Sequence, residues 1–324
     1  MGDNVALEAF SRVLPILLLV GLGVLIRRRA FVAPGTIDDL RKLILGVTLP
    51  AALFLAFLRV ELEPKYAVIV ASVFAACVAL LAVAPWLRRG ARVGAASMPN
   101  LMAGFEAGML GYALFAAVFG AAELYRFAIV DIGQVLFVFF ILATVVTMRA
   151  SGRRPPLADT VAAFVRNPVI LAILGGIGGS LVGLDESLDS HPLGMAVLTT
   201  LGLLAALTTP LIAIVLGYST SLRSGSLRDP LRTLAIRLPI WVGLALVFNI
   251  VVVDGLLGLD ALFQAAVMTM AILPPPFVVP LYMARAVGHG IETDPEHDYT
   301  VNTLSLATMA TLAAIVVVGV VYAT

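Results

Sequence analysis

Long apolar runs fill most of this chain, and short polar or turn-forming breaks separate them. A helix that spans a bilayer needs roughly 20 mainly apolar residues. Runs of that length predict ten transmembrane helices, near residues 7–26, 37–58, 66–87, 95–119, 127–148, 168–184, 192–222, 231–253, 260–287 and 299–322. The run at 192–222 predicts either one tilted helix or a helix with a short re-entrant piece. The pattern therefore indicates an all-α polytopic membrane protein.

The composition agrees with this pattern and excludes a soluble domain carried by one anchor. Hydrophobic residues make up 61% and charged residues 13% of the 324 residues, and the mean hydropathy is +1.05. Soluble chains carry roughly 45–50% apolar and about 25% charged residues. The net charge is only +1, with the Lys and Arg residues in short loops, so nothing favours a nucleic-acid partner.

The sequence offers little chemistry for a metal or a cofactor. Cys77 is the only cysteine, and it falls inside an apolar run. His191, His289 and His297 lie in loops without the spacing of metal ligands. A Gly-rich phosphate loop, a nucleophile elbow and an HExxH pattern are absent from the sequence. We therefore expect no metal and no cofactor, and we do not expect an enzyme.

The basic residues predict an orientation. With ten spans, the even-numbered connections and the two termini lie on one side of the membrane and hold only Arg12, Arg59, Lys65 and Arg126. The odd-numbered connections, with their adjacent helix ends, hold the other 17 of the 21 Lys and Arg residues. The positive-inside rule places the richer side in the cytoplasm. We expect a multi-pass protein of the inner (cytoplasmic) membrane, with both termini on the non-cytoplasmic side.

Short matches between the two halves predict an internal repeat. The Thr-Leu-Pro run at 48–50 in the second segment matches the Thr-Thr-Pro run at 208–210 in the seventh. Pro15 and Gly23 in the first segment match Pro168 and Gly176 in the sixth. Because each half has an odd number of spans, the second half enters from the opposite face. We predict one membrane domain of two inverted five-helix repeats, residues 1–150 and 151–324.

Glu106 lies near the centre of the fourth predicted segment, among glycines that include Gly108. An ionised carboxylate at that depth costs ~3 kcal/mol or more unless it meets water, a partner or a proton. The glycines allow a backbone or a substrate to approach closely. The position favours a substrate or proton site, and the alternatives are a structural ion pair or a protonated packing residue.

Three successive prolines, Pro274, Pro275 and Pro276, interrupt the ninth predicted segment. They remove three amide donors and cannot continue an α-helix. Such a break persists in a bilayer only where protein or a water-filled cavity covers the freed carbonyls. The half-helix that begins near Phe277 would direct its positive end to mid-membrane. The alternative is a kink that only packs against a neighbour.

Other polar residues lie near the same depth. Asp131 and Gln134 share one face of the fifth segment, and they predict either a cavity shared with Glu106 or, for Asp131, an interfacial position open to water. Asn100 and Asn167 are candidates for the same site or for helix caps. For Arg237, we expect a side chain that reaches out to the cytoplasmic surface.

The chain resembles the auxin efflux carrier family, which includes plant auxin carriers and bacterial permeases for malate, malonate and similar organic anions. The likeness covers nearly the whole chain and lies in short apolar patterns whose order and spacing carry it. These patterns are Leu14-Pro15 to Gly23, Leu49-Pro50-Ala51, Gly108 to Gly120, Arg166-Asn167-Pro168, Thr209-Pro210 with Leu216-Gly217, and the prolines of the ninth segment.

The resemblance implies a ten-helix fold of two inverted repeats, divided into a scaffold and a transport bundle, with a homodimer formed through the scaffold. It also implies that the fourth and ninth helices are broken and cross at mid-membrane beside the substrate carboxylate. The sequence departs from the family there. Glu106 and Val279 stand where the family has asparagines, and Ala113 stands where it has a proline, whereas Pro275 matches.

From these features we predict a secondary active or potential-driven transporter that moves a small organic solute, first of all an organic anion, by alternating access. The alternatives are a proton-coupled carrier of a neutral or cationic solute and a membrane receptor or assembly component that translocates nothing. The proton carrier would be Glu106. The predicted substrate site contains Glu106, Gly108, Asn100, Gln134, Asp131, Asn167, Pro275 and Pro276.

Overall fold

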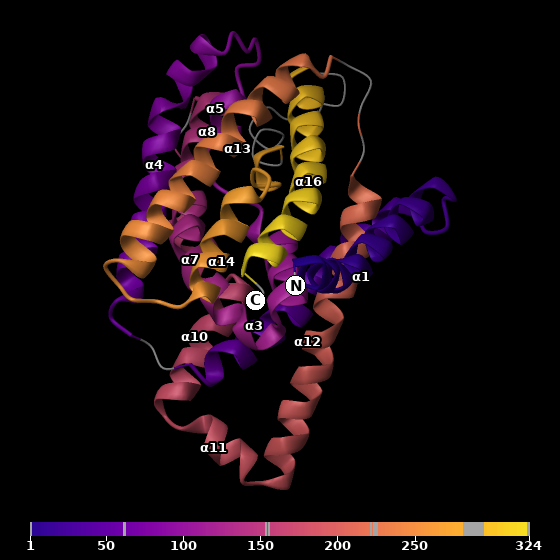
Figure 1. Cartoon of the computed structure of the whole chain (residues 1–324), viewed down its shortest axis with the longest axis vertical. Coiled ribbons are helices and arrows are strands. Elements are labelled where there is room, and N and C mark those ends of the chain that lie inside the picture. Colours follow the sequence, from indigo (N-terminus) through magenta and orange to yellow (C-terminus); the bar gives the residue numbers. More distant parts are fainter. Residues whose placement is uncertain are drawn as a thin grey trace.

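The computed structural model describes residues 2–60, 63–152, 154, 156–220, 222, 226–280 and 295–322, and the regular elements of these residues are all helices (Figure 1). The first half contains α1 (Gly2–Arg28), α2 (Pro34–Leu43), the π-helical turn η1 (Ile44–Thr48), α3 (Leu49–Leu58), α4 (Tyr66–Gly90), α5 (Met98–Met102), the π-helical turn η2 (Ala107–Gly111), α6 (Tyr112–Phe119), the 3-10 turn η3 (Ala121–Glu123), α7 (Leu124–Leu136), the π-helical turn η4 (Phe137–Leu142) and α8 (Ala143–Ser151). The second half contains α9 (Leu157–Val165), α10 (Pro168–Leu181), α11 (Leu184–Asp189), α12 (Pro192–Ser219), α13 (Arg228–Phe248), the π-helical turn η5 (Asn249–Asp254), α14 (Ala261–Ile272) and α16 (Pro295–Tyr322).

Seven helical stretches in the described part of the chain are long and apolar enough to cross a membrane. They are Gly35–Leu58, Tyr66–Gly90, Met98–Phe119, Ala121–Arg149, Pro192–Ser219, Arg228–Asp254 and Pro295–Tyr322. The pair α9 and α10, bent by 58°, makes an eighth if it is one span. The protein is therefore an all-helical, polytopic membrane protein.

Two of the ten predicted segments are not among these stretches. The first predicted segment forms the helix α1, which is not one of the stretches named above. The ninth begins as α14, a helix of 12 residues, and the predicted residues 281–287 lie outside the described part of the chain. The run at 192–222 forms one continuous helix, α12, rather than a helix with a re-entrant piece.

The fourth and ninth segments are both broken, and they cross at their breaks. Between α5 and η2 the chain is non-helical, and Gly104 has a φ of +78°, which favours glycine. A Cβ on Gly104 would lie 2.9 Å from Cγ of Pro276, so the two breaks are in close contact. The Glu106 amide donates a hydrogen bond of 2.9 Å to the Pro274 carbonyl oxygen. Backbone polar groups freed at one break are thus partly satisfied by the other.

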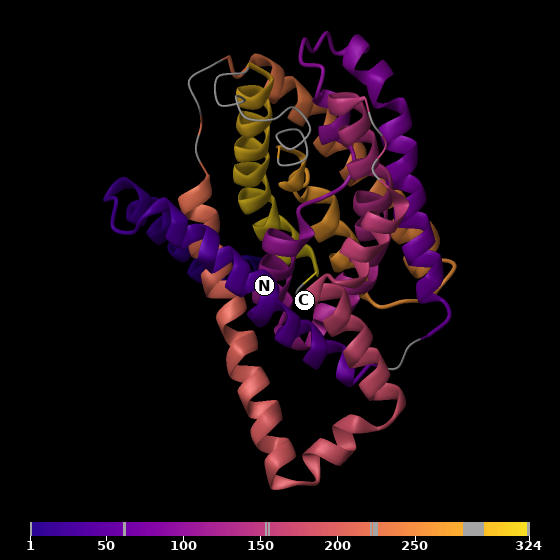
Figure 2. The same ribbon diagram turned by 180° about the vertical axis from the view of Figure 1, so that it is seen from behind.

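The helices pack in pairs around this crossing. Figures 1 and 2 show α1 lying beside α12, while α10, α11 and α12 extend together beyond one end of the bundle. Elsewhere α3 packs on α10, α4 on α7, and α16 on both α13 and α14. The Met98–Phe119 stretch is buried along most of its length, so the crossing lies inside the bundle rather than on its outer face.

Two of these pairs approach so closely that only glycine fits. A Cβ on Gly23 of α1 would collide with the Ile214 carbonyl oxygen of α12. A Cβ on Gly176 of α10 would lie 2.7 Å from the Phe54 carbonyl oxygen of α3. Small residues at such contacts let helix backbones approach in a membrane, where packing rather than water exclusion holds helices together.

Candidate functional site

A cavity of about 480 Å³ lies beside the helix crossing. Its lining combines a few polar side chains with many apolar ones, as in typical small-molecule sites. The lining residues are Arg41, Leu45, Phe105, Glu106, Gly108, Met109, Tyr112, Asp131, Gln134, Val135, Val138, Phe139, Asn167, Val169, Ile170, Leu216, Ser219, Thr220, Pro276, Phe277, Val278, Val301, Leu304, Ser305 and Thr308. Three of the π-helical turns, η1, η2 and η4, contribute to it.

Six of the eight predicted site residues line this one cavity: Glu106, Gly108, Asp131, Gln134, Asn167 and Pro276. The other two do not line it. Pro275 lies within the break beside Pro276 and is buried, whereas Asn100 is inside α5, where its side-chain oxygen accepts a hydrogen bond of 2.8 Å from Arg149. Asn100 is not a helix cap either, because Ser97 holds the N-cap position of α5.

Glu106 joins the two broken helices through its side chain. Its Oε1 accepts a hydrogen bond of 3.2 Å from the Met109 amide, at the start of the η2–α6 helix. Its Oε2 accepts one of 2.6 Å from the Phe277 amide, directly after the proline break. A carboxylate near a helix N-terminus is stabilised by the free amides and by the helix dipole. Glu106 is therefore a cap for the fourth helix and a link to the ninth.

Asp131 is held by a second set of hydrogen bonds at the same end of the cavity. The Tyr112 hydroxyl donates to its Oδ2 at 2.8 Å, and Nε2 of Gln134 donates to its Oδ1 at 2.9 Å. Oε1 of Gln134 in turn accepts a hydrogen bond from the Phe105 amide. The side chain of Asp131 is buried, so the alternative of an interfacial residue open to water is wrong.

The opposite end of the cavity is more exposed. Arg41 lines it with 38% of its side chain exposed, and it donates to Oδ1 of Asp38 at 3.0 Å and to Oγ of Ser219. Asn167 also lies there, and its Oδ1 accepts a hydrogen bond of 2.9 Å from the Val169 amide as the N-cap of α10. The cap that the sequence offered as an alternative for Asn167 is therefore correct, and the same residue lines the cavity.

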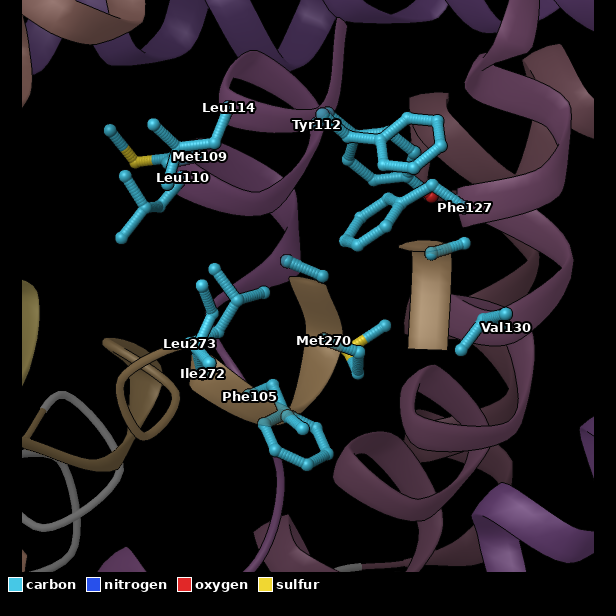
Figure 3. Close-up of a cluster of buried hydrophobic side chains, with 14 of the residues drawn as sticks. Phe105, Met109, Leu110, Tyr112, Leu114, Phe127, Val130, Met270, Ile272 and Leu273 are labelled. Carbon is cyan, nitrogen blue, oxygen red and sulfur yellow. The ribbon is translucent and has the colours of Figure 1, made fainter. Parts of the chain in front are cut away.

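Aromatic and aliphatic side chains pack around the crossing next to the cavity (Figure 3), and a few of them also line it. Figure 3 shows side chains of α6, α7 and α14 gathered around the two breaks, with Phe105 and Leu273 at the breaks themselves. The rings of Tyr112 and Phe127 meet edge to face with centroids 5.0 Å apart, which fixes the hydroxyl of Tyr112 toward Asp131. The polar groups of the site thus stand on a rigid apolar support.

Arg237 of α13 lies on another side of the crossing and does not line the cavity. The expectation that it reaches the membrane surface is wrong, because only 2% of the residue is exposed. Its guanidinium donates to the carbonyl oxygens of Leu101, Met102, Gly104 and Leu273 at 3.1, 2.6, 2.7 and 3.3 Å. These carbonyls belong to the ends of α5 and α14, which the helix breaks leave without partners.

Six polar residues that line the cavity are not among the predicted site residues: Arg41, Tyr112, Ser219, Thr220, Ser305 and Thr308. Arg41 lies inside the predicted second span, and an ionisable residue within a span is a signal for function that would have found it. Tyr112 gives no comparable signal, because a tyrosine in an apolar segment is most often a packing residue.

Among the described residues, no group of three or more His, Cys, Asp or Glu side chains lies close enough to hold a metal ion. Comparisons with known proteins give no further guidance, since no family model and no curated protein matches this chain. Any functional proposal therefore depends on the cavity and its chemistry.

Proposed function

We propose that this protein is a secondary transporter that moves a small organic solute across the membrane by alternating access. The observation that carries the proposal is the cavity of about 480 Å³ at the crossing of two broken helices inside a membrane-spanning bundle. Non-helical backbone at membrane depth is tolerated where protein or a water-filled cavity covers it, and transporters place their substrate sites at such breaks.

An inverted repeat would fit this proposal, and the glycine contacts support one. Gly23 and Gly176 are the sequence-matched glycines of the first and sixth segments. Gly23 meets the carbonyl of Ile214, four residues after Pro210, and Gly176 meets that of Phe54, four residues after Pro50. A two-fold exchange of the halves converts the first contact into the second.

Buried hydroxyls follow the same exchange. Thr48 and Thr208 each precede the matched prolines by two residues, and in both the side-chain oxygen is buried without a hydrogen-bond partner among the described residues. The pairing of α4 with α7 likewise corresponds to that of α13 with α16. These correspondences favour ten spans in two inverted halves, as the resemblance to the auxin efflux carrier family implies.

The cavity also fits one state of an alternating-access cycle. Its buried end lies at the crossing, and its more exposed end is lined by Arg41, Asn167, Ser219 and Thr220, next to odd-numbered connections. The excess of Lys and Arg on that side favours the cytoplasm. We therefore infer an inward-facing state in the inner membrane, with both termini on the other side.

A receptor or assembly component with the same fold would expose the cavity to one side only. Val301 lines the cavity from α16, is half-buried, and suits a test in a Cys77→Ser background. For a transporter, Val301→Cys reacts with an impermeant thiol reagent added to either side of oriented vesicles. Ile315→Cys, on the same helix and fully buried outside the cavity, is the control that stays unreactive. Reaction from one side only, under all conditions, would contradict alternating access.

A further inference from the structure

The cavity ends at two buried carboxylates, Glu106 and Asp131. Both oxygens of Glu106 accept hydrogen bonds from backbone amides, and both oxygens of Asp131 accept from side-chain donors. The Phe105 N–H donates a hydrogen bond, so it must face the side-chain oxygen of Gln134 and not its NH2 group. The NH2 group of Gln134 then faces Asp131 as a donor. A group that accepts at both oxygens has the pattern of an ionised carboxylate.

In the described part of the chain, no Lys, Arg or His side chain forms a hydrogen bond or a salt bridge with either of these two groups. Among the described residues that line the cavity, Arg41 is the only Lys, Arg or His. Arg41 acts on the charge of Glu106 only through space, because its guanidinium pairs with Asp38 and donates to Ser219, and its buried Nε has no hydrogen-bond partner among the described residues. The cavity wall therefore has one positive side chain for two buried carboxylates. Arg237, the base on another side of the crossing, gives its hydrogen bonds to carbonyls. Uncompensated buried charge is costly, so a positive charge is favoured at the closed end.

Glu106 already accepts the hydrogen bonds of two backbone amides at the helix breaks. The Met109 amide, near the start of the η2–α6 helix, donates to its Oε1. The Phe277 amide donates to its Oε2. A solute carboxylate could use these two amides only by displacing Glu106, and it would then lie against the negative charge of Glu106.

The size and the walls of the cavity point to an organic cation rather than a bare ion. A volume of about 480 Å³ is in the range of sites for small organic molecules, and far larger than an ion requires. Phe139 and Phe277 line it, and aromatic faces attract organic cations, whereas the ring of Phe105 already lies 5.2 Å from the Arg237 guanidinium. Because both carboxylates already accept hydrogen bonds from the protein, they attract a solute mainly through their charge. A cation whose charge is spread over a larger group suits such a site, since it needs fewer direct hydrogen bonds.

We propose that the cavity takes a small organic cation with an apolar or aromatic part, its charge beside Glu106 and Asp131 and its apolar part against the phenylalanines. The proposal rests on the transport function proposed above and names the substrate class of the same site. It replaces the organic anion that the sequence put first with the cationic solute that it gave as an alternative.

Three probes that share a benzyl group separate the possibilities: benzylguanidinium, which stays positively charged at neutral pH, neutral benzylurea, and benzylsulfonate, which stays negatively charged. Two measurements use the full chain, namely thermal unfolding of the purified protein with each probe and counterflow of each labelled probe in proteoliposomes. We expect stabilisation by benzylguanidinium and counterflow that exceeds that of the other two about tenfold or more.

Variants locate the effect in the cavity. Glu106→Gln and Asp131→Asn keep the shape of the side chains and remove one charge each, and we expect each to lower benzylguanidinium counterflow about tenfold or more. Asp39→Asn, on an exposed residue of α2 that pairs with Lys42 outside the cavity, is the matched control and leaves counterflow unchanged. If Glu106→Gln does not fold, Asp131→Asn carries the test.

Each remaining outcome is informative. Counterflow of benzylsulfonate without that of benzylguanidinium would overturn the cationic site and leave the transporter in place. Stabilisation by benzylguanidinium without counterflow of any probe would support the cationic site and count against transport. Stabilisation by Na⁺ and not by benzylguanidinium would overturn the organic cation, and no response to any probe would overturn the cationic site together with its substrate class.

Discussion

Two buried charged residues lie at the helix crossing, Arg237 and Glu106. Arg237 donates hydrogen bonds to backbone carbonyls, whereas Glu106 accepts hydrogen bonds from backbone amides. Arg237 faces carbonyl oxygens at the ends of α5 and α14, and Glu106 faces amides that follow the two breaks. Arg237 has protein on all sides near the crossing, whereas Glu106 lines the cavity. Both are buried, at 2% and 8% exposure, so burial alone does not distinguish them.

The two residues differ in their access to a ligand. The guanidinium of Arg237 donates to four carbonyl oxygens, and the residue does not line the cavity. Glu106 is also bonded to the backbone, but its charge faces a space that a solute can enter. An intramembrane charge is therefore functional evidence only together with an adjacent cavity, and a buried charge without one is first a structural partner of the backbone.

The largest effect is expected from Arg237→Met, which keeps the apolar stem and removes all the donors. Four carbonyls lose a charged partner, and hydrogen bonds to charged groups contribute about 1.5–3 kcal/mol each. We expect the free energy of unfolding to fall by more than ~3 kcal/mol. Thermal unfolding in detergent measures it, with Arg237→Lys as a partial rescue. Unfolding at the wild-type temperature would show that the carbonyls do not depend on Arg237.

A smaller loss of stability is expected from Glu106→Gln. The amide group offers one acceptor oxygen, so one of the two backbone donors, Met109 or Phe277, loses its partner. We expect a decrease of about 2 kcal/mol in the free energy of unfolding. The same measurement in detergent compares it with Arg237→Met. A loss as large as that of Arg237→Met would mean that both charges are mainly structural, and the contrast between them would disappear.

Tyr112→Phe sharpens the comparison on the cavity side. It removes the hydroxyl that donates to Asp131, while Gln134 remains as a donor and the ring still packs on Phe127. We expect about 1 kcal/mol of stability to be lost. Phe115→Leu, a change of a buried ring away from the cavity, tells packing loss from loss of the hydrogen bond. If Tyr112→Phe binds solute with unchanged affinity, the Tyr112 hydroxyl does not contribute to binding.

The smallest effect belongs to Trp241→Phe beside Arg237. The indole Nε1 donates to the Met102 carbonyl oxygen at 2.9 Å, and Arg237 donates to the same oxygen at 2.6 Å. Because Arg237 keeps that oxygen paired, we expect a loss of only about 0.5 kcal/mol. Thermal unfolding and solute counterflow are the measurements. A change in solute preference would contradict the view that this side of the crossing serves the fold alone.

Sequence reasoning located the closed end of the cavity because its signals are local. A carboxylate inside an apolar run and three adjacent prolines are visible without any tertiary information, and Glu106 and Pro276 do lie together. Arg237 was misplaced because its partners lie on α5 and α14, which no local pattern connects to α13. Asn100 was misplaced for a similar reason, since its partner is Arg149, at the end of α8.

The helix count shows the same limit. Apolar runs predicted the helical class, which depends on composition and length. Seven or eight helices in the described part of the chain are long and apolar enough to cross a membrane, which agrees with that class. The break that divides the fourth segment into α5 and η2–α6 is marked in residues 103–106 only by Gly104. The sequence predicted this break only through the resemblance to the family. Breaks made by one glycine are hard to distinguish from glycines that serve helix packing.

The π-helical turns have a consequence for how the chain tolerates the loss of single residues. A π-helical turn carries one residue more than an α-helical turn, so one deletion can restore the regular helix. Deleting a residue of η4 would rotate α8 by about 100° relative to α7 and carry Arg149 away from Asn100. The extra residue thus sets the rotation of α8 relative to α7, and with it the contact between Arg149 and Asn100.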